Sequence, residues 1–143
     1  MTKFNFYVKW LYILSMIIIV FGITLAIFKN TLLSPLINDI FGSAFWTTKV
    51  IDEGTIKFKN LTWSLFGAVM TCWGILLLGI VNNSFKKQER WAWNSILLST
   101  LGWFVIDESF SIYYHVWVNA IGNIPLFIAI IFPLIMTKKE MKT

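Results

Sequence analysis

Four long apolar runs, separated by polar segments, dominate the chain. The spans that they predict cover residues 10–28, 61–81, 91–113 and 117–136. A helix of the first run's length spans about 28 Å, close to the roughly 30 Å hydrocarbon core of a bilayer. The pattern therefore predicts an all-α integral membrane protein, in which residues 1–143 form one domain, a bundle of four transmembrane helices.

The third run is the least regular of the four. It begins at Trp91 and is apolar only as far as Ile106, which is slightly short for a crossing. A helix that continues through Asp107 and Glu108 to about Tyr113 is long enough. We therefore expect two carboxyl groups near one end of this span.

The longest polar connection, residues 29–60, contains a helical pattern of its own. Ser34 and Pro35 resemble an N-cap and a first helical position, and apolar residues then recur at helical spacing as far as Phe45. This predicts a short amphipathic helix on the extracytoplasmic surface, between the first two spans, with an ordinary loop as the alternative. Residues 47–60 alternate polar and apolar positions, which favours a small hairpin or an irregular loop.

Small side chains gather near one face of the second span. They belong to Ser64, Gly67, Ala68, Thr71 and Gly74. Small residues let helix backbones approach closely in lipid, where packing drives association. We expect this face to pack on another helix of the same chain, and contact with a second copy or with another membrane protein is the alternative.

Composition supports a membrane protein and argues against a nucleic-acid-binding one. Hydrophobic residues make up 57% of the chain and charged residues 13%, against roughly 25% charged residues in soluble domains. The net charge is +5, but the basic residues lie at the ends of the apolar runs and form no basic face. With four crossings both termini lie on one side, together with most of the basic residues, so the positive-inside rule places both termini in the cytoplasm.

The main candidate chemistry follows the third span. On a helix, Asp107, Ser111 and His115 share one face, and a fourth helix starting near His115 places Asn119 and Asn123 on a shared face in turn. An antiparallel hairpin then brings the polar faces together, beside aromatic walls from Trp103, Tyr113, Tyr114 and Trp117. The expected binding residues of this pocket, which opens to the outer leaflet, are Trp103, Asp107, Ser111, Tyr114, His115, Asn119 and Asn123.

Three functions fit such a pocket. The leading one is binding of a lipid, a small apolar ligand or a protein partner without catalysis. The second is an enzyme for a lipid-like substrate, with Asp107, Glu108 and His115 as acid–base groups. The third is an accessory subunit of a larger membrane complex, which contacts its neighbours through the small-residue face. A purely structural reading leaves the carboxylates at the wet end of their helix and the asparagines bonded between helices.

Other kinds of site find little support in the sequence. The single cysteine, Cys72, lies inside an apolar run and excludes an intrachain disulfide. Acidic residues and one histidine without a recognised spacing do not predict a metal site. We therefore expect neither a metal nor a cofactor.

A basic and aromatic motif precedes the third span. Lys86, Lys87 and Arg90 suit anionic lipid headgroups, and Trp91 and Trp93 suit anchoring at the interface. The partners expected from the whole chain are membrane lipids, a lipid-like small molecule and a second copy or another membrane protein.

This motif also carries a resemblance. Residues 86–93, read together with Asp107 near the far end of the same span, are similar to a group of small bacterial four-helix membrane proteins, some of them described as DoxX-like. Many of those sequences have glycine where this chain has Gln88. The resemblance implies a four-helix protein of the bacterial cytoplasmic membrane and brings no established activity.

Overall fold

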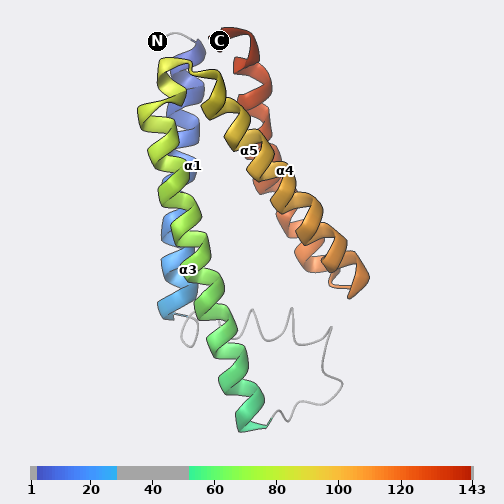
Figure 1. The fold of residues 1–143 in the computed structure, drawn as a ribbon. Coiled ribbons are helices and arrows are strands. Elements are labelled where there is room, and N and C mark those ends of the chain that lie inside the picture. Colours follow the sequence, from blue (N-terminus) through green and yellow to red (C-terminus); the bar gives the residue numbers. More distant parts are fainter. Residues whose placement is uncertain (1–2, 29–51, 143) are drawn as a thin grey trace. The chain divides into compact units, whose positions relative to one another are not determined.

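The computed structural model describes residues 3–28 and 52–142, and these residues form four long helices (Figure 1). The helices are α1 (Lys3–Phe28), α3 (Glu53–Asn83), α4 (Arg90–Tyr113) and α5 (Trp117–Thr137). Each is long and apolar enough to cross a membrane, which confirms the prediction of four long apolar helices. The expected amphipathic helix and residues 47–51 lie outside the described residues.

Two short 3-10 helices lie at the ends of the long helices. They are η1 (Phe85–Lys87), between α3 and α4, and η2 (Lys138–Glu140), after α5. The chain divides into two compact units, one formed by residues 1–16 and 75–143 and the other by residues 17–74.

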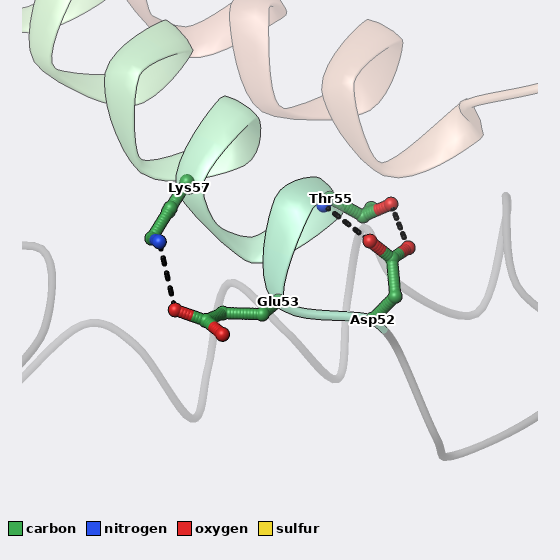
Figure 2. Close-up of polar contacts among 4 residues, drawn as sticks. All are labelled: Asp52, Glu53, Thr55 and Lys57. Atoms are coloured by element: carbon green, nitrogen blue, oxygen red, sulfur yellow. Dashed lines mark hydrogen bonds and ion pairs between the residues drawn. The ribbon is translucent and has the colours of Figure 1, made fainter.

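Helix α3 begins well before the apolar run, so the hairpin or loop expected at residues 53–60 is wrong. The start of the helix is set by Asp52, whose Oδ1 accepts a hydrogen bond from the backbone N–H of Thr55 at 3.0 Å. The backbone carbonyl of Asp52 accepts the first helical bond, from the N–H of Ile56, at 3.1 Å. This is N-cap geometry, and it satisfies donors that a helix start otherwise leaves unpaired (Figure 2).

A second side-chain contact supports the same turn. The Nζ of Lys57 lies 2.7 Å from Oε1 of Glu53, one helical turn earlier (Figure 2). A glutamate four residues before a lysine is the favourable order for such a pair on a helix. Hydrogen bonding and charge thus extend α3 through residues whose alternating polarity suggests a strand.

The cap gives α3 a dependence on pH. Hydrogen bonds from the side chain and backbone N–H of Thr55 hold the pKa of Asp52 below its ordinary value of 3.8. A carboxyl group with a lower pKa in the folded state stabilises the fold above its unfolded pKa, and this contribution is lost as the pH falls through the folded pKa. We expect the first turn of α3 to fray below pH 3.8, seen as faster amide hydrogen exchange at Thr55 and Ile56. The Asp52→Asn variant keeps an acceptor that does not titrate, so an identical loss of protection in that variant would contradict the prediction.

Within residues 17–74, α1 and α3 pack closely through glycines. A Cβ added to Gly67 would lie 2.5 Å from the backbone oxygen of Gly22 and 2.5 Å from the backbone nitrogen of Ala26. A Cβ added to Gly22 would lie 2.6 Å from the backbone nitrogen of Thr71. No side chain fits at either position, so the small-residue face of α3 is covered by α1 of the same chain. Ala68, which the sequence placed near this face, is exposed.

In the other unit, α4 and α5 pair along their length (Figure 1). The core of this unit consists of side chains that are less than 2% exposed, contributed by α1, the end of α3, the turn before α4, α4 and α5. They include Leu11, Phe85, Ile96, Ile130 and Leu134. The ring of Phe4 stacks on Phe85 with centroids 5.9 Å apart, which places the start of α1 beside the turn between α3 and α4.

Helix α5 contains two prolines, and the second creates a contact with α1. Pro133 has no N–H, so the carbonyl of Ala129, four residues earlier, lacks its usual helical donor. The indole Nε1 of Trp10 donates to this carbonyl at 2.9 Å. A side chain of α1 therefore satisfies a backbone acceptor that the sequence of α5 leaves open.

This contact makes a prediction about two positions at once. Replacing Trp10 with phenylalanine removes the donor and leaves the Ala129 carbonyl unpaired, which we expect to cost about 0.5–2 kcal/mol of unfolding free energy. In a Pro133→Ala background the N–H of residue 133 can fill the carbonyl, so the same change should cost less. A double-mutant cycle of unfolding in micelles measures the difference. Equal costs in both backgrounds would show that Trp10 acts only through packing.

Candidate functional site

The site is built on the turn that joins α4 to α5. The N–H of Val116 donates to the carbonyl of Ser111 at 2.8 Å, and the N–H of His115 donates to that of Ile112 at 3.1 Å. These two bonds form a Schellman motif, which ends a helix with one residue in the left-handed region. That residue is His115, with a φ of 58°. The turn sends α5 back alongside α4, as the sequence predicted.

The hairpin brings a carboxylate of α4 against two amides of α5. Oδ1 of Asp107 accepts hydrogen bonds from Nδ2 of Asn119 at 2.6 Å and from Nδ2 of Asn123 at 2.7 Å. The hydroxyl of Ser111, one turn after Asp107, lies 3.2 Å from the same oxygen. Nδ2 of Asn119 also donates to Oγ of Ser111 at 2.8 Å. We call these four residues the Asp107 cluster.

The cluster is partly shielded from solvent. Ser111 is buried, whereas Asp107, Asn119 and Asn123 are half-buried. Because residues four apart lie on one face of a helix, each helix contributes two members from successive turns. The cluster therefore stabilises the hairpin and also places a carboxylate among neutral donors.

Residues close to the cluster in sequence have properties that the sequence did not reveal. Oε1 of Glu108 is buried and has no hydrogen-bond partner within the described residues. The rings of Phe104 on α4 and Phe127 on α5 stack with centroids 4.0 Å apart and planes inclined by 24°. Phe104 lies one turn before Asp107 and Phe127 one turn after Asn123, so an aromatic pair adjoins the cluster on the side away from the turn.

The remaining residues expected in the pocket differ in their exposure. Tyr114, Tyr113 and Trp117 are exposed, and the two tyrosine rings pack edge to face on each other at 4.9 Å. His115 is exposed, with its ring 6.3 Å from that of Trp117. Trp103 is half-buried and packs its ring against Phe104.

His115 has a backbone role that can be tested. A left-handed φ costs most residues about 1–2 kcal/mol, is free of that cost in glycine, and is worst for β-branched residues. We expect His115→Gly to keep or raise the thermal stability and His115→Val to lower it. Tyr114→Val is the matched control, because Tyr114 has a negative φ of −89°. Equal stabilities of the glycine and valine variants at position 115 would show that the turn does not depend on this backbone conformation.

The tryptophan and the arginine at the start of α4 make contacts that bury part of the motif. Nε1 of Trp93 donates to the carbonyl of Leu134 at 2.8 Å, and Trp93 is only 7% exposed. The guanidinium of Arg90 lies 5.3 Å from the centre of the Trp93 ring. Trp93 is therefore a core residue, which corrects the expectation that it anchors at the interface. Trp91 is 53% exposed and remains suited to that role.

The turn before α4 also holds a carboxylate and a second left-handed residue. Hydrogen bonds from Ser84 and from Trp91 Nε1, the latter at 2.6 Å, together with the charge of Lys87, keep the pKa of Glu89 below its ordinary value. Gln88 has a φ of 65°, a conformation that favours glycine.

No family model matches the chain, and no curated protein or solved structure matches it. What the Asp107 cluster can do therefore follows from its own geometry. A carboxylate whose Oδ1 accepts from two amides, with the Ser111 hydroxyl 3.2 Å away, can direct its other oxygen toward a donor or a positive charge on a bound molecule. Among the described residues, no group of three histidine, cysteine, aspartate or glutamate side chains is placed to hold a metal ion.

Proposed function

We propose that the chain is a multi-pass membrane protein that binds a lipid or a small apolar ligand at the Asp107 cluster. One observation carries the proposal: Oδ1 of Asp107 is held by two amides and a hydroxyl, while Oε1 of the adjacent Glu108 is buried without a partner among the described residues. A carboxyl oxygen shielded from water without a hydrogen bond is costly. A ligand that offers a hydrogen-bond donor would remove that cost.

The surroundings of the cluster indicate what such a ligand looks like. The stacked Phe104 and Phe127 and the apolar faces of α4 and α5 suit a hydrocarbon or ring system. Asp107 and Glu108 suit a hydroxyl or amine head. An amphipathic molecule with an uncharged or cationic donor head fits both parts, whereas an anionic head would be repelled.

The same proposal includes a location and an orientation. The start of α1 and the residues after α5 both lie beside the turn between α3 and α4. This side of the structure carries Lys3, Lys9 and the lysines of the motif. The positive-inside rule assigns it to the cytoplasm. The Asp107 cluster then lies toward the outer leaflet of a bacterial cytoplasmic membrane, on the side of the extracytoplasmic helix expected between the first two spans.

The relationship with small bacterial four-helix proteins also remains a proposal. It rests on residues 86–93 and Asp107. The left-handed conformation of Gln88 is compatible with the glycine that many of those sequences have at this position.

The two alternative functions have less support. An acid–base site would need His115 near the carboxylates, but His115 is exposed in the turn and Asp107 is engaged by Ser111, Asn119 and Asn123. An accessory subunit that docks through the small-residue face of α3 would need that face open, but α1 covers Gly67. The geometry therefore favours binding without catalysis.

Native mass spectrometry of the protein released from lipid nanodiscs tests the proposal. We expect the wild-type chain to retain a small molecule that is absent from Asp107→Asn, in which the shape is kept and the charge removed. His115→Gly is the matched control, because it lies next to the cluster in sequence, preserves the turn and should retain the adduct. A wild-type spectrum without any adduct, or an adduct unaffected by Asp107→Asn, would refute binding at this site.

A further inference from the structure

The residues after α5 are tied to the turn between α3 and α4. The N–H of Lys142 donates to the carbonyl of Gln88 at 2.7 Å, and the N–H of Arg90 donates to the carbonyl of Lys142 at 3.1 Å. Nη1 of Arg90 also donates to the carbonyl of Lys138 at 3.1 Å. These bonds, with the parallel bridge between Glu89 and Lys142, hold the last described residues beside η1.

This arrangement gathers lysines that are far apart in the sequence. Lys86 and Lys87 are on η1, and Lys138, Lys139 and Lys142 follow α5; all five are exposed. Two acidic residues lie among them. Glu89 is engaged by Ser84 and Trp91, and Glu140 is exposed. The five lysines outnumber these two carboxylates, so the surface that they form, which we call the lysine surface, is positive.

We propose that the lysine surface binds the phosphate groups of anionic phospholipids, and that the segment after α5 supplies half of the site. The inference does not rest on the function proposed for the Asp107 cluster. Arg90 serves here as a positioning residue, because its guanidinium packs on Trp93 and donates to the backbone of Lys138.

The position of the surface favours lipid over an acidic protein. The lysines lie just before the first residue of α4 and just after the last residue of α5, two helices that are long and apolar enough to cross a membrane. If α4 and α5 cross a bilayer, their ends lie at the level of the phosphates. The exposed Trp91 at the start of α4 suits the same level, because an indole is best placed where apolar and polar surroundings meet.

Both groups of lysines contribute to the proposed site. The bonds of Lys142 to Gln88 and Arg90 hold the terminal segment beside η1, so both groups are available to phosphate groups at one membrane surface. Each basic side chain near an anionic membrane surface strengthens binding by about fivefold. The structure thus predicts that lysines after α5 matter as much as those of the motif before α4.

The test measures which lipids stay on the protein. The chain is placed in nanodiscs with equal amounts of phosphatidylglycerol and phosphatidylcholine, and native mass spectrometry counts the lipids retained after release. We expect the wild type to be enriched in phosphatidylglycerol, and Lys138→Gln/Lys139→Gln to lose about tenfold or more of that enrichment. The matched control, Lys57→Gln/Lys59→Gln, removes the same charge from α3 and should keep it. Equal enrichment in the two double variants would overturn the proposal.

A second pair of variants tests the hydrogen bond from Lys142 to Gln88, which holds the terminal segment beside η1. Lys142→Gln and Lys142→Pro both remove the charge, but only proline lacks the N–H that donates to Gln88. We expect the proline variant to lose more enrichment than the glutamine variant, and equal losses would show that the placement of the terminal segment is irrelevant. Binding of a polyglutamate peptide without any preference for phosphatidylglycerol would replace the lipid by an acidic protein partner.

The result of the lipid-enrichment test can be distinguished from the result of the ligand test at the Asp107 cluster. Asp107→Asn should leave the phosphatidylglycerol enrichment unchanged, because the lysine surface lies at the opposite end of the α4–α5 hairpin. A loss of enrichment in Asp107→Asn would contradict an independent headgroup site.

Discussion

Replacing Gly67 with alanine is expected to destabilise the protein by about 1–3 kcal/mol or more, although alanine is the better helix former. The added methyl carbon would lie 2.5 Å from backbone atoms of Gly22 and Ala26, so α1 and α3 would have to move apart. The free energy of unfolding in micelles or nanodiscs, followed by circular dichroism, measures the effect.

Two other glycines provide controls, because alanine at those positions is expected to raise the free energy of unfolding. A Cβ added to Gly79 or Gly102 meets nothing within 4 Å. Alanine at these positions should therefore show only the gain in helix propensity, up to about 1 kcal/mol. A stabilising Gly67→Ala, or a loss of stability shared by all three variants, would mean that close approach at Gly67 does not hold α1 against α3.

The second large effect is expected at Asp107. Asp107→Leu removes the acceptor shared by the half-buried Asn119 and Asn123, so Asn123 loses this bond and Nδ2 of Asn119 keeps only its bond to Oγ of Ser111. We expect a loss of about 2–4 kcal/mol in unfolding free energy, since each unsatisfied buried group costs about 1–3 kcal/mol and interhelical hydrogen bonds in membranes are individually modest.

A triple variant separates the structural role of the cluster from a binding role. Changing Asp107, Asn119 and Asn123 together to leucine removes the donors along with the acceptor, so most of the lost stability should return. If the cluster binds a ligand, the stable triple variant should still lack the adduct seen with the wild type. A triple variant that remains as unstable as Asp107→Leu would indicate that packing of the leucines, and not unpaired polar groups, causes the loss.

The four helices could be predicted from hydropathy because apolar runs of this length have few other uses. Their ends could not. Helix α1 begins at Lys3 and α3 at Glu53, both well before the apolar runs at 10–28 and 61–81. A hydropathy pattern detects only the uncharged part of a helix, whereas the helix itself continues as long as its backbone is hydrogen-bonded and its first turn is capped.

The Asp107 cluster could be predicted in part. The spacing of four residues correctly placed Asp107 with Ser111, and Asn119 with Asn123, and the short turn brought the two pairs together. The place of His115 was not predictable, because a left-handed residue in a Schellman motif is usually glycine and its presence here has no signal in the sequence.

Contacts between segments that are far apart in the sequence were the hardest to predict. Nothing in the order of residues shows that Lys142 pairs with Gln88, or that Trp93 is buried against Leu134. The exposed or buried state of each tryptophan depends on its neighbours in space, so a Trp-rich motif alone cannot separate an interface anchor from a core residue.

The bond between Trp10 and Ala129 also determines how α1 can slide against α5. In the second half of α5, Pro133 leaves the carbonyl of Ala129 without its helical donor, and carbonyls one turn away keep theirs. A shift of α1 by one turn, about 5.4 Å, would move the indole to an acceptor that is already filled and leave the open one unpaired. Pro133 thus favours one axial register of the two helices. The bond from Trp10 opposes a displacement of α1 along the axis of α5 at this point.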